Sequence, residues 1–265
     1  MNITLPDNSI RELPTGSTGL DLAESIGPGL AKAAIAVVVN GIQKDLSDPI
    51  KEDSDVSIIT ITSNEGLEIM RHTLTAQVLA RAVQNLFPET KLAIGPTIKD
   101  GFYYDFESKK TISNDDLEKI EAEMKKIIST ESLIEKRLHT KEEALKIFAE
   151  KNESYKEIII NEADQEDNFQ LYYQDNDEFV DLCRGPHLPS LKHIGAFKLT
   201  IQGTGTLDID NQNLRFNDVN SIIQIDGADT FFDGEITTSA DSDTSGTGRI
   251  DTANVLYSTA FRKGL

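Results

Sequence analysis

The sequence lacks the features of a membrane, secreted or disulfide-bonded protein. No apolar run approaches the ~20 residues that a membrane-spanning helix needs. The N-terminal stretch Met1–Pro14 has neither a basic start nor an apolar segment, so it does not resemble a secretory signal. The single cysteine, Cys183, excludes an internal disulfide and is typical of a reducing compartment. We therefore expect a cytoplasmic protein with no membrane partner.

Positive charge is also scarce. The chain has 45 Asp and Glu against 26 Lys and Arg, which gives a net charge of -19 over 265 residues. Proteins that bind nucleic-acid phosphates usually present a basic face. Composition alone therefore favours a small-molecule enzyme or a protein-binding module, and any RNA contact has to rest on a few local lysines and arginines.

Residues 1–62 have the pattern of a small α/β domain. Alternating apolar residues on both sides of the turn Pro6-Asp7-Asn8 predict a hairpin. Further elements follow in order: a helix over 20–26, a strand over 34–39, the hairpin turn Asn40-Gly41 and a strand over 57–61. A hairpin, a helix and then more strands is the order of a β-grasp, or ubiquitin-like, domain.

Residues 65–200 alternate helices and strands and predict an α+β domain. Apolar residues recur every three to five positions from Ser63 to Phe87, which predicts a helix with one buried stripe. Two capping boxes, Ser113 with Asp116 and Thr140 with Glu143, predict two more helices. Five strand-like segments lie between and after the helices: 102–106, 155–160, 169–173, 179–182 and 197–201.

The last segment, residues 201–265, differs in composition. It contains ten Asp and Glu against four Lys and Arg, and Gly, Thr, Asp and Asn dominate it. Residues 206–210 and 221–225 alternate in the manner of strands, and 241–248 has the low complexity of a flexible loop. We expect an acidic tail, β-rich or disordered, that is unrelated to the two preceding domains.

One short stretch combines residue types that can carry chemistry. Cys183-Arg184-Gly185-Pro186-His187 places a thiol and an imidazole four residues apart, and Gly-Pro favours a turn over a helix. Asp181 lies two residues before Cys183 and therefore shares its strand face. Such a group can activate a water or ligate a metal. A buried cysteine with a capping histidine is the commoner arrangement.

Three other residues gain interest only in combination. His72 lies on the first helix of the second domain, Lys156 lies in the strand-like segment 155–160, and Tyr104 lies on the strand over 102–106. Taken singly, they fit a packed histidine, a solvated lysine and a core tyrosine.

Together these stretches resemble the threonyl-tRNA synthetase family. Residues 1–62 resemble its TGS domain, and residues 65–200 resemble its editing domain, the second additional domain, which alanyl-tRNA synthetases share. The stretches that carry the resemblance are LEIMRH (67–72), AIGPTIKDGFYYD (93–105), ESYK (153–156), FVDLCRGPH (179–187) and FKL (197–199).

The resemblance implies hydrolysis of serine that has been wrongly attached to threonine tRNA. Serine lacks one methyl group of threonine, a difference worth only ~1–3 kcal/mol, so a second site is needed to multiply selectivity. The residues carried over as catalytic are His72, Lys156, Cys183 and His187, and those carried over as substrate-binding are Tyr104, Asp181 and Gln77. In these roles Lys156 would position water or the ribose, and Asp181 would bind the ammonium group of the amino acid.

The chain departs from the family pattern on the first long helix. The family has histidines four residues apart, whereas Ala76 follows His72 at that spacing and Gln77 at five. At ~100° per residue, a spacing of five puts two side chains ~140° apart unless a π-bulge absorbs the extra residue. An amide also binds zinc poorly. We therefore expect no cofactor and no four-ligand zinc site, although His72, Cys183 and His187 could still ligate a metal.

The second departure is at the C-terminal side. The chain has no tryptophan and no stretch that leads into a class II catalytic core, so we expect a truncated region with no ATP site and no ligase activity. Three functions remain open: an editing hydrolase that binds threonine tRNA weakly, a degenerate remnant with weak or no activity, and a non-enzymatic TGS-containing module that binds RNA or protein.

Overall fold

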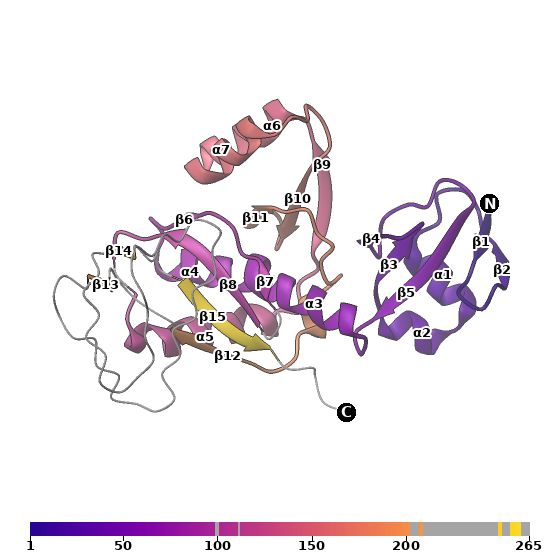
Figure 1. The fold of residues 1–265 in the computed structure, drawn as a ribbon, viewed down its shortest axis with the longest axis horizontal. Coiled ribbons are helices and arrows are strands. Elements are labelled where there is room, and N and C mark those ends of the chain that lie inside the picture. The colour runs from indigo at the N-terminus through magenta and orange to yellow at the C-terminus, as the bar shows by residue number, and fades with distance from the viewer. Residues whose placement is uncertain (99–100, 111, 202–206, 209–248, 251–254, 261–265) are drawn as a thin grey trace.

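The structure is a computed structural model that describes residues 1–98, 101–110, 112–201, 207–208, 249–250 and 255–260. Figure 1 shows a small N-terminal domain, a larger second domain, and helix α3 running from one into the other. None of the helices in the described part of the chain is long and apolar enough to cross a membrane.

The first domain is a β-grasp, as predicted. Its mixed sheet has the strand order β2-β1-β5-β3-β4, in which β1 and β5 run parallel. The sheet is made of β1 (Asn2–Thr4), β2 (Ile10–Glu12), β3 (Ala34–Val39), β4 (Ile42–Asp45) and β5 (Ser54–Thr60), and its helices are α1 (Gly19–Ile26) and α2 (Pro28–Ala33). Asn40 and Gly41 have φ of 51° and 81°, the positive values that a tight hairpin turn requires. The sequence pattern does not predict α2, whose first residue is Pro28, a residue that is common at the first position of a helix.

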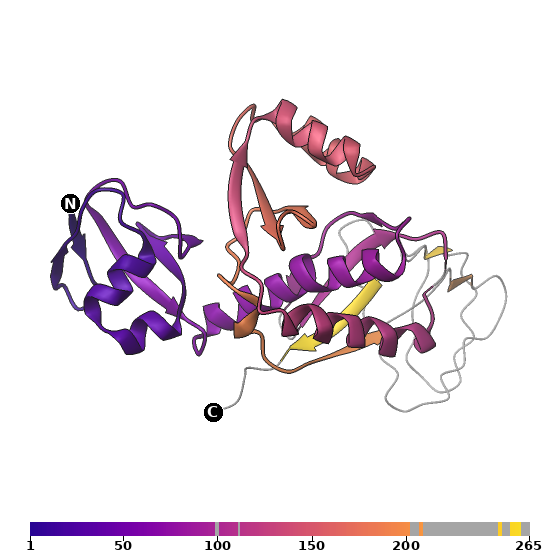
Figure 2. The ribbon, with the colours of Figure 1, turned by 180° about the vertical axis from the view of Figure 1, so that it is seen from behind.

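One long helix crosses the second domain where the sequence predicts it. It consists of α3 (Asn64–Thr73), the π-helical segment η1 (Leu74–Leu79) and α4 (Ala80–Leu86). Seen from behind, α5 (Asn114–Ser129) runs beside this helix (Figure 2). The two predicted capping boxes are present at the starts of α5 and α6 (Lys141–Glu150).

Two sheets flank the long helix. One has the order β11-β10-β9 and is made of β9 (Glu135–His139), β10 (Phe169–Gln174) and β11 (Phe179–Leu182). The other has the order β12-β15-β8-β6, with β7 paired to β8, and is made of β6 (Lys91–Leu92), β7 (Thr97–Ile98), β8 (Gly101–Glu107), β12 (Phe197–Ile201) and β15 (Val255–Ala260). These sheets position β11 and its following loop against α3.

The C-terminal segment contributes a strand to this second sheet. β15 lies antiparallel between β8 and β12. The sequence pattern does not predict this strand, because residues 201–265 are expected to be unrelated to the second domain. A two-residue pair, β13 (Leu207–Asp208) with β14 (Arg249–Ile250), comes from the same segment. The strand expected over 221–225 and the loop expected over 241–248 lie outside the described residues, as does most of the strand expected over 206–210.

The strand predicted over 155–160 is wrong. This segment belongs to α7 (Ser154–Glu162), which packs beside α6. The misleading signal was the run Ile158–Ile160, because β-branched residues favour strands. The helix buries Lys156 and Ile160, four residues apart on one face, and leaves Ile158 and Ile159 exposed by 49% and 38%. Lys156 is therefore a buried residue on the first turn of a helix.

One apolar cluster spans the two domains. Ile35, Ala36 and Ile59 of the first domain belong to the same buried cluster as Ile69 and Met70 of α3. Contact between buried apolar side chains removes both surfaces from water, which favours a docked arrangement over a loose tether. The first domain is thus packed directly against the element that carries His72.

Candidate functional site

Two histidines and the single cysteine meet between α3 and the loop that follows β11. Nε2 of His72 lies 2.9 Å from Sγ of Cys183, although the two residues are 111 positions apart in the sequence. The rings of His72 and His187 stack with their centroids 4.6 Å apart. The ligand atoms of the three residues all lie within 4.8 Å of one another. The structure therefore brings together three of the four residues that the resemblance implies to be catalytic.

Thr73 determines the tautomer of His187. Its hydroxyl donates to the carbonyl of Ile69 at 2.8 Å, so the hydroxyl oxygen is left as an acceptor. Nδ1 of His187, 3.2 Å away, then has to carry a proton and donate it to Thr73, an assignment made from the hydrogen-bond network. Nε2 of His187 consequently bears a lone pair, and it is buried with no hydrogen-bond partner among the described residues. This nitrogen can accept a proton or bind a metal.

Burial favours the neutral form of both imidazoles. It lowers the pKa of His72, against the opposing effect of the Asp181 and Asp45 carboxylates. It also lowers the pKa of His187, where the Cys183 side chain opposes the shift and His72 adds to it. A neutral ring has one nitrogen with a lone pair, so His187 can act as a base at neutral pH without first losing a proton.

The free energy of unfolding is expected to decrease as the pH falls below about 6.5, the pKa of a histidine in an unfolded chain. There the unfolded chain protonates both rings, whereas the folded chain keeps them neutral to a lower pH. The stabilisation is therefore complete above that value and is lost as the pH falls through the lowered pKa values. Urea denaturation across this range measures the effect. A His187→Gln variant should show a weaker pH dependence, and an unchanged dependence would contradict the assignment.

A second buried group contains Lys156, Asp181 and Tyr104. Nζ of Lys156 lies 2.6 Å from the carboxylate of Asp181, and the two side chains are only 3% and 2% exposed. The same ammonium lies 3.4 Å from the hydroxyl of Tyr104. Burial raises the pKa of Asp181, and the charge of Lys156 opposes that shift. Burial likewise raises the pKa of Tyr104. Asp181 thus already binds the ammonium group of Lys156.

The π-helical segment η1 absorbs the extra residue between His72 and Gln77. Its i→i+5 hydrogen bonds bring residues five apart onto successive turns, and five is the spacing between His72 and Gln77. Gln77 is fully buried, its Oε1 accepts from Nε2 of Gln174 at 2.8 Å, and its own Nε2 has no partner among the described residues. It makes no hydrogen bond with His72, Cys183 or His187, so the structure does not join it to their cluster.

The cluster of His72, Cys183 and His187 offers three ligands to a metal ion. A tetrahedral zinc site needs four, and His72, Cys183 and His187 supply imidazole and thiolate donors of the right type. The side-chain oxygen of Gln77, the residue nearest in register to the missing histidine, is already bonded to Gln174. Within the described part of the chain, the donor atoms that lie within 4.8 Å of one another belong to three residues, so the cluster offers a three-ligand set.

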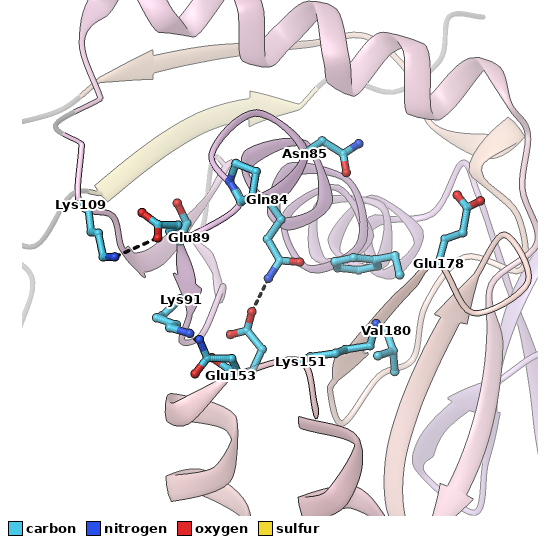
Figure 3. Close-up of a pocket in the computed structure, with 13 residues that line it drawn as sticks. Gln84, Asn85, Glu89, Lys91, Lys109, Lys151, Glu153, Glu178 and Val180 are labelled. Carbon is cyan, nitrogen blue, oxygen red and sulfur yellow. Dashed lines mark hydrogen bonds and ion pairs between the residues drawn. The ribbon is translucent and has the colours of Figure 1, made fainter. Parts of the chain in front are cut away.

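Glu153 is a structural support of the site that sequence reasoning passed over, although it lies in the ESYK stretch. Its carboxylate accepts from Gln84 of α4 (Figure 3). It also accepts from the N–H of Leu92 at 2.9 Å. Burial raises its pKa. It lies in the wall of a pocket of about 350 Å³ that includes none of the seven predicted site residues. By anchoring the residue before α7, Glu153 positions the first turn, where Lys156 lies.

Comparisons with known proteins agree with the fold. The TGS domain family matches residues 1–60, and the threonyl and alanyl tRNA synthetase second additional domain matches residues 170–224, beyond the boundary expected at 200. The threonine–tRNA ligase of Carboxydothermus hydrogenoformans is 42% identical over 224 residues, which is 84% of this chain and 34% of the relative. That of Pelobacter propionicus is 48% identical over 199 residues, 75% of this chain and 31% of the relative. The chain thus spans about a third of the length of these relatives, and it belongs to the threonyl-tRNA synthetase family through a TGS domain and a second additional domain.

Proposed function

We propose that this protein hydrolyses serine from wrongly charged threonine tRNA. The observation that carries the proposal is the neutral His187, whose buried Nε2 has a lone pair and no partner among the described residues. It lies against His72 and Cys183, in a domain whose family role is editing. A base of this kind suits ester hydrolysis, because the reaction needs a proton taken from water at neutral pH.

The reaction needs only water as co-reactant. Nε2 of His187 takes a proton from a water molecule while the water oxygen attacks the carbonyl carbon of the seryl ester. The bond between that carbon and the ribose oxygen then breaks, and the ribose oxygen receives the proton from His187. Serine and a tRNA with a free terminal hydroxyl are released. Stacking on His72 and the hydrogen bond to Thr73 hold the His187 ring in place during both transfers.

Two features favour a second candidate, a module that binds RNA without turnover. A substrate ammonium could reach Asp181 only by displacing Lys156 from a buried ion pair. Gln77 also supplies an amide where the family has an imidazole, and this amide cannot transfer a proton. The net charge of -19 predicts weak tRNA binding in either case, because phosphate contacts supply much of the affinity for nucleic acid.

One assay separates the two candidates. The protein is incubated with threonine tRNA charged with serine and, separately, with threonine, and the release of each amino acid is followed. A hydrolase should release serine faster than the uncatalysed reaction and faster than threonine. Serine release at the uncatalysed rate would contradict hydrolysis, and binding of uncharged tRNA in the same preparation would then support the module.

A further inference from the structure

The TGS domain reaches into the histidine–cysteine cluster through Asp45, the last residue of β4. One carboxylate oxygen of Asp45 accepts from the backbone N–H of His187 at 2.9 Å. The other accepts from the hydroxyl of Tyr172 at 2.8 Å and pairs with the ammonium of Lys136 at the same distance. Asp45 is buried. A single side chain of the first domain thus bonds to three residues of the second.

These contacts converge on the loop from Cys183 to His187. Gly185 has a φ of +65°, and a Cβ at this position would lie 1.9 Å from the hydroxyl oxygen of Tyr172. The ring of Tyr172 also meets the ring of His187 edge to face, with centroids 4.4 Å apart. Asp45 therefore holds the loop by its backbone at His187 and holds the side chain against which the loop packs. A charged acceptor makes both hydrogen bonds stronger than neutral ones.

The first domain is in turn held firmly against the second. The apolar cluster that spans the two domains packs β3 and β5 against α3, which carries His72. Lys136 of β9 forms ion pairs with both Asp45 and Asp48 across the interface. The helix that supplies His72 and the loop that supplies His187 are thus both placed by contacts with the TGS domain.

We propose that Asp45 is a positioning residue of the histidine–cysteine cluster, and that the docked TGS domain completes the site by holding the Cys183–His187 loop. The structural part of this proposal stands by itself, and its kinetic part rests on the hydrolysis proposed above. Without Asp45 the N–H of His187 loses its acceptor, and the lone pair on Nε2 of His187 is no longer held at a fixed place.

Hydrogen–deuterium exchange of the full chain tests the structural part. In Asp45→Ala, the peptide that contains residues 183–188 should take up deuterium about 10-fold faster, because its amide opens without unfolding the domain. Asp45→Asn keeps an oxygen of similar position and should restore part of the protection. Asp53→Ala is the matched control, because Asp53 is also an aspartate of the TGS domain and, among the residues that the structure describes, accepts only the N–H of Asn2.

Deacylation kinetics test the functional part. Asp45→Ala should lower kcat by about 10²-fold with little change in KM, because a displaced base slows the chemical step more than binding. An unchanged exchange rate of the loop in Asp45→Ala, or equal acceleration in Asp53→Ala, overturns the positioning role. Faster loop exchange in Asp45→Ala, in a protein whose unsubstituted form does not release serine, supports the positioning role and contradicts only the hydrolysis.

Discussion

Replacement of His187 by alanine is expected to slow the release of serine from threonine tRNA by about 10²–10⁴-fold, the usual contribution of a general base. The reason is specific to one atom. The hydroxyl of Thr73 accepts a hydrogen bond from Nδ1–H of His187, so Nε2 is the nitrogen with the lone pair. Burial lowers the pKa of His187 and so favours the neutral ring. The ring of His72 differs, because its Nε2 lies 2.9 Å from Sγ of Cys183.

The matched control is His139→Ala. His139 lies on β9, and its Nε2 bonds to the hydroxyl of Tyr173 at 2.9 Å, outside the cluster. The control variant should keep most of the deacylation rate. Thermal unfolding of both variants shows whether each is folded. A folded His187→Ala variant that releases serine as fast as His139→Ala would remove His187 from the mechanism and leave the water to another base.

Local patterns in the sequence were sufficient for most of the fold. The capping boxes at Ser113 and Thr140 and the turn at Asn40-Gly41 each involve residues within four positions, and all three are confirmed. The error at 155–160 has a physical origin. A run of isoleucines carries a strand preference, but burial of Lys156 and Ile160 on one face stabilises a helix, and tertiary packing outweighs propensity.

Only part of the site could be predicted from the sequence. The spacing of His72 and Gln77 required a π-bulge if Gln77 was to stay on the buried face, and η1 has that geometry. The bond of Gln77 to Gln174 had no signal, because the two residues are 97 positions apart. The same holds for Asp45, which meets His187 across 142 positions. Contacts of this kind depend on how two domains dock, and periodicity within one element carries no information about docking.

Substitution of Lys156 by methionine is expected to reduce the free energy of unfolding by about 3–5 kcal/mol, the usual cost of leaving a buried charge without its partner. Methionine fills a similar volume, so the loss is electrostatic and not a cavity. The carboxyl group of Asp181 would then escape the cost by taking up a proton, because burial already raises its pKa. A carboxyl group with a raised pKa in the folded state gives stability that is present at low pH and lost as the pH rises. Lys156→Met should therefore lose less stability near pH 5 than at neutral pH.

The exposed pair of Lys109 and Glu89 provides the comparison. Its side chains are 76% and 70% exposed at a separation of 3.0 Å, so Lys109→Met should cost at most about 1 kcal/mol. Urea denaturation of both variants measures the difference. If Lys156→Met costs no more than Lys109→Met, solvent reaches Asp181 in the folded protein, and a substrate ammonium can reach it too. A large cost would instead mean that Lys156 has to be displaced before Asp181 can bind a substrate.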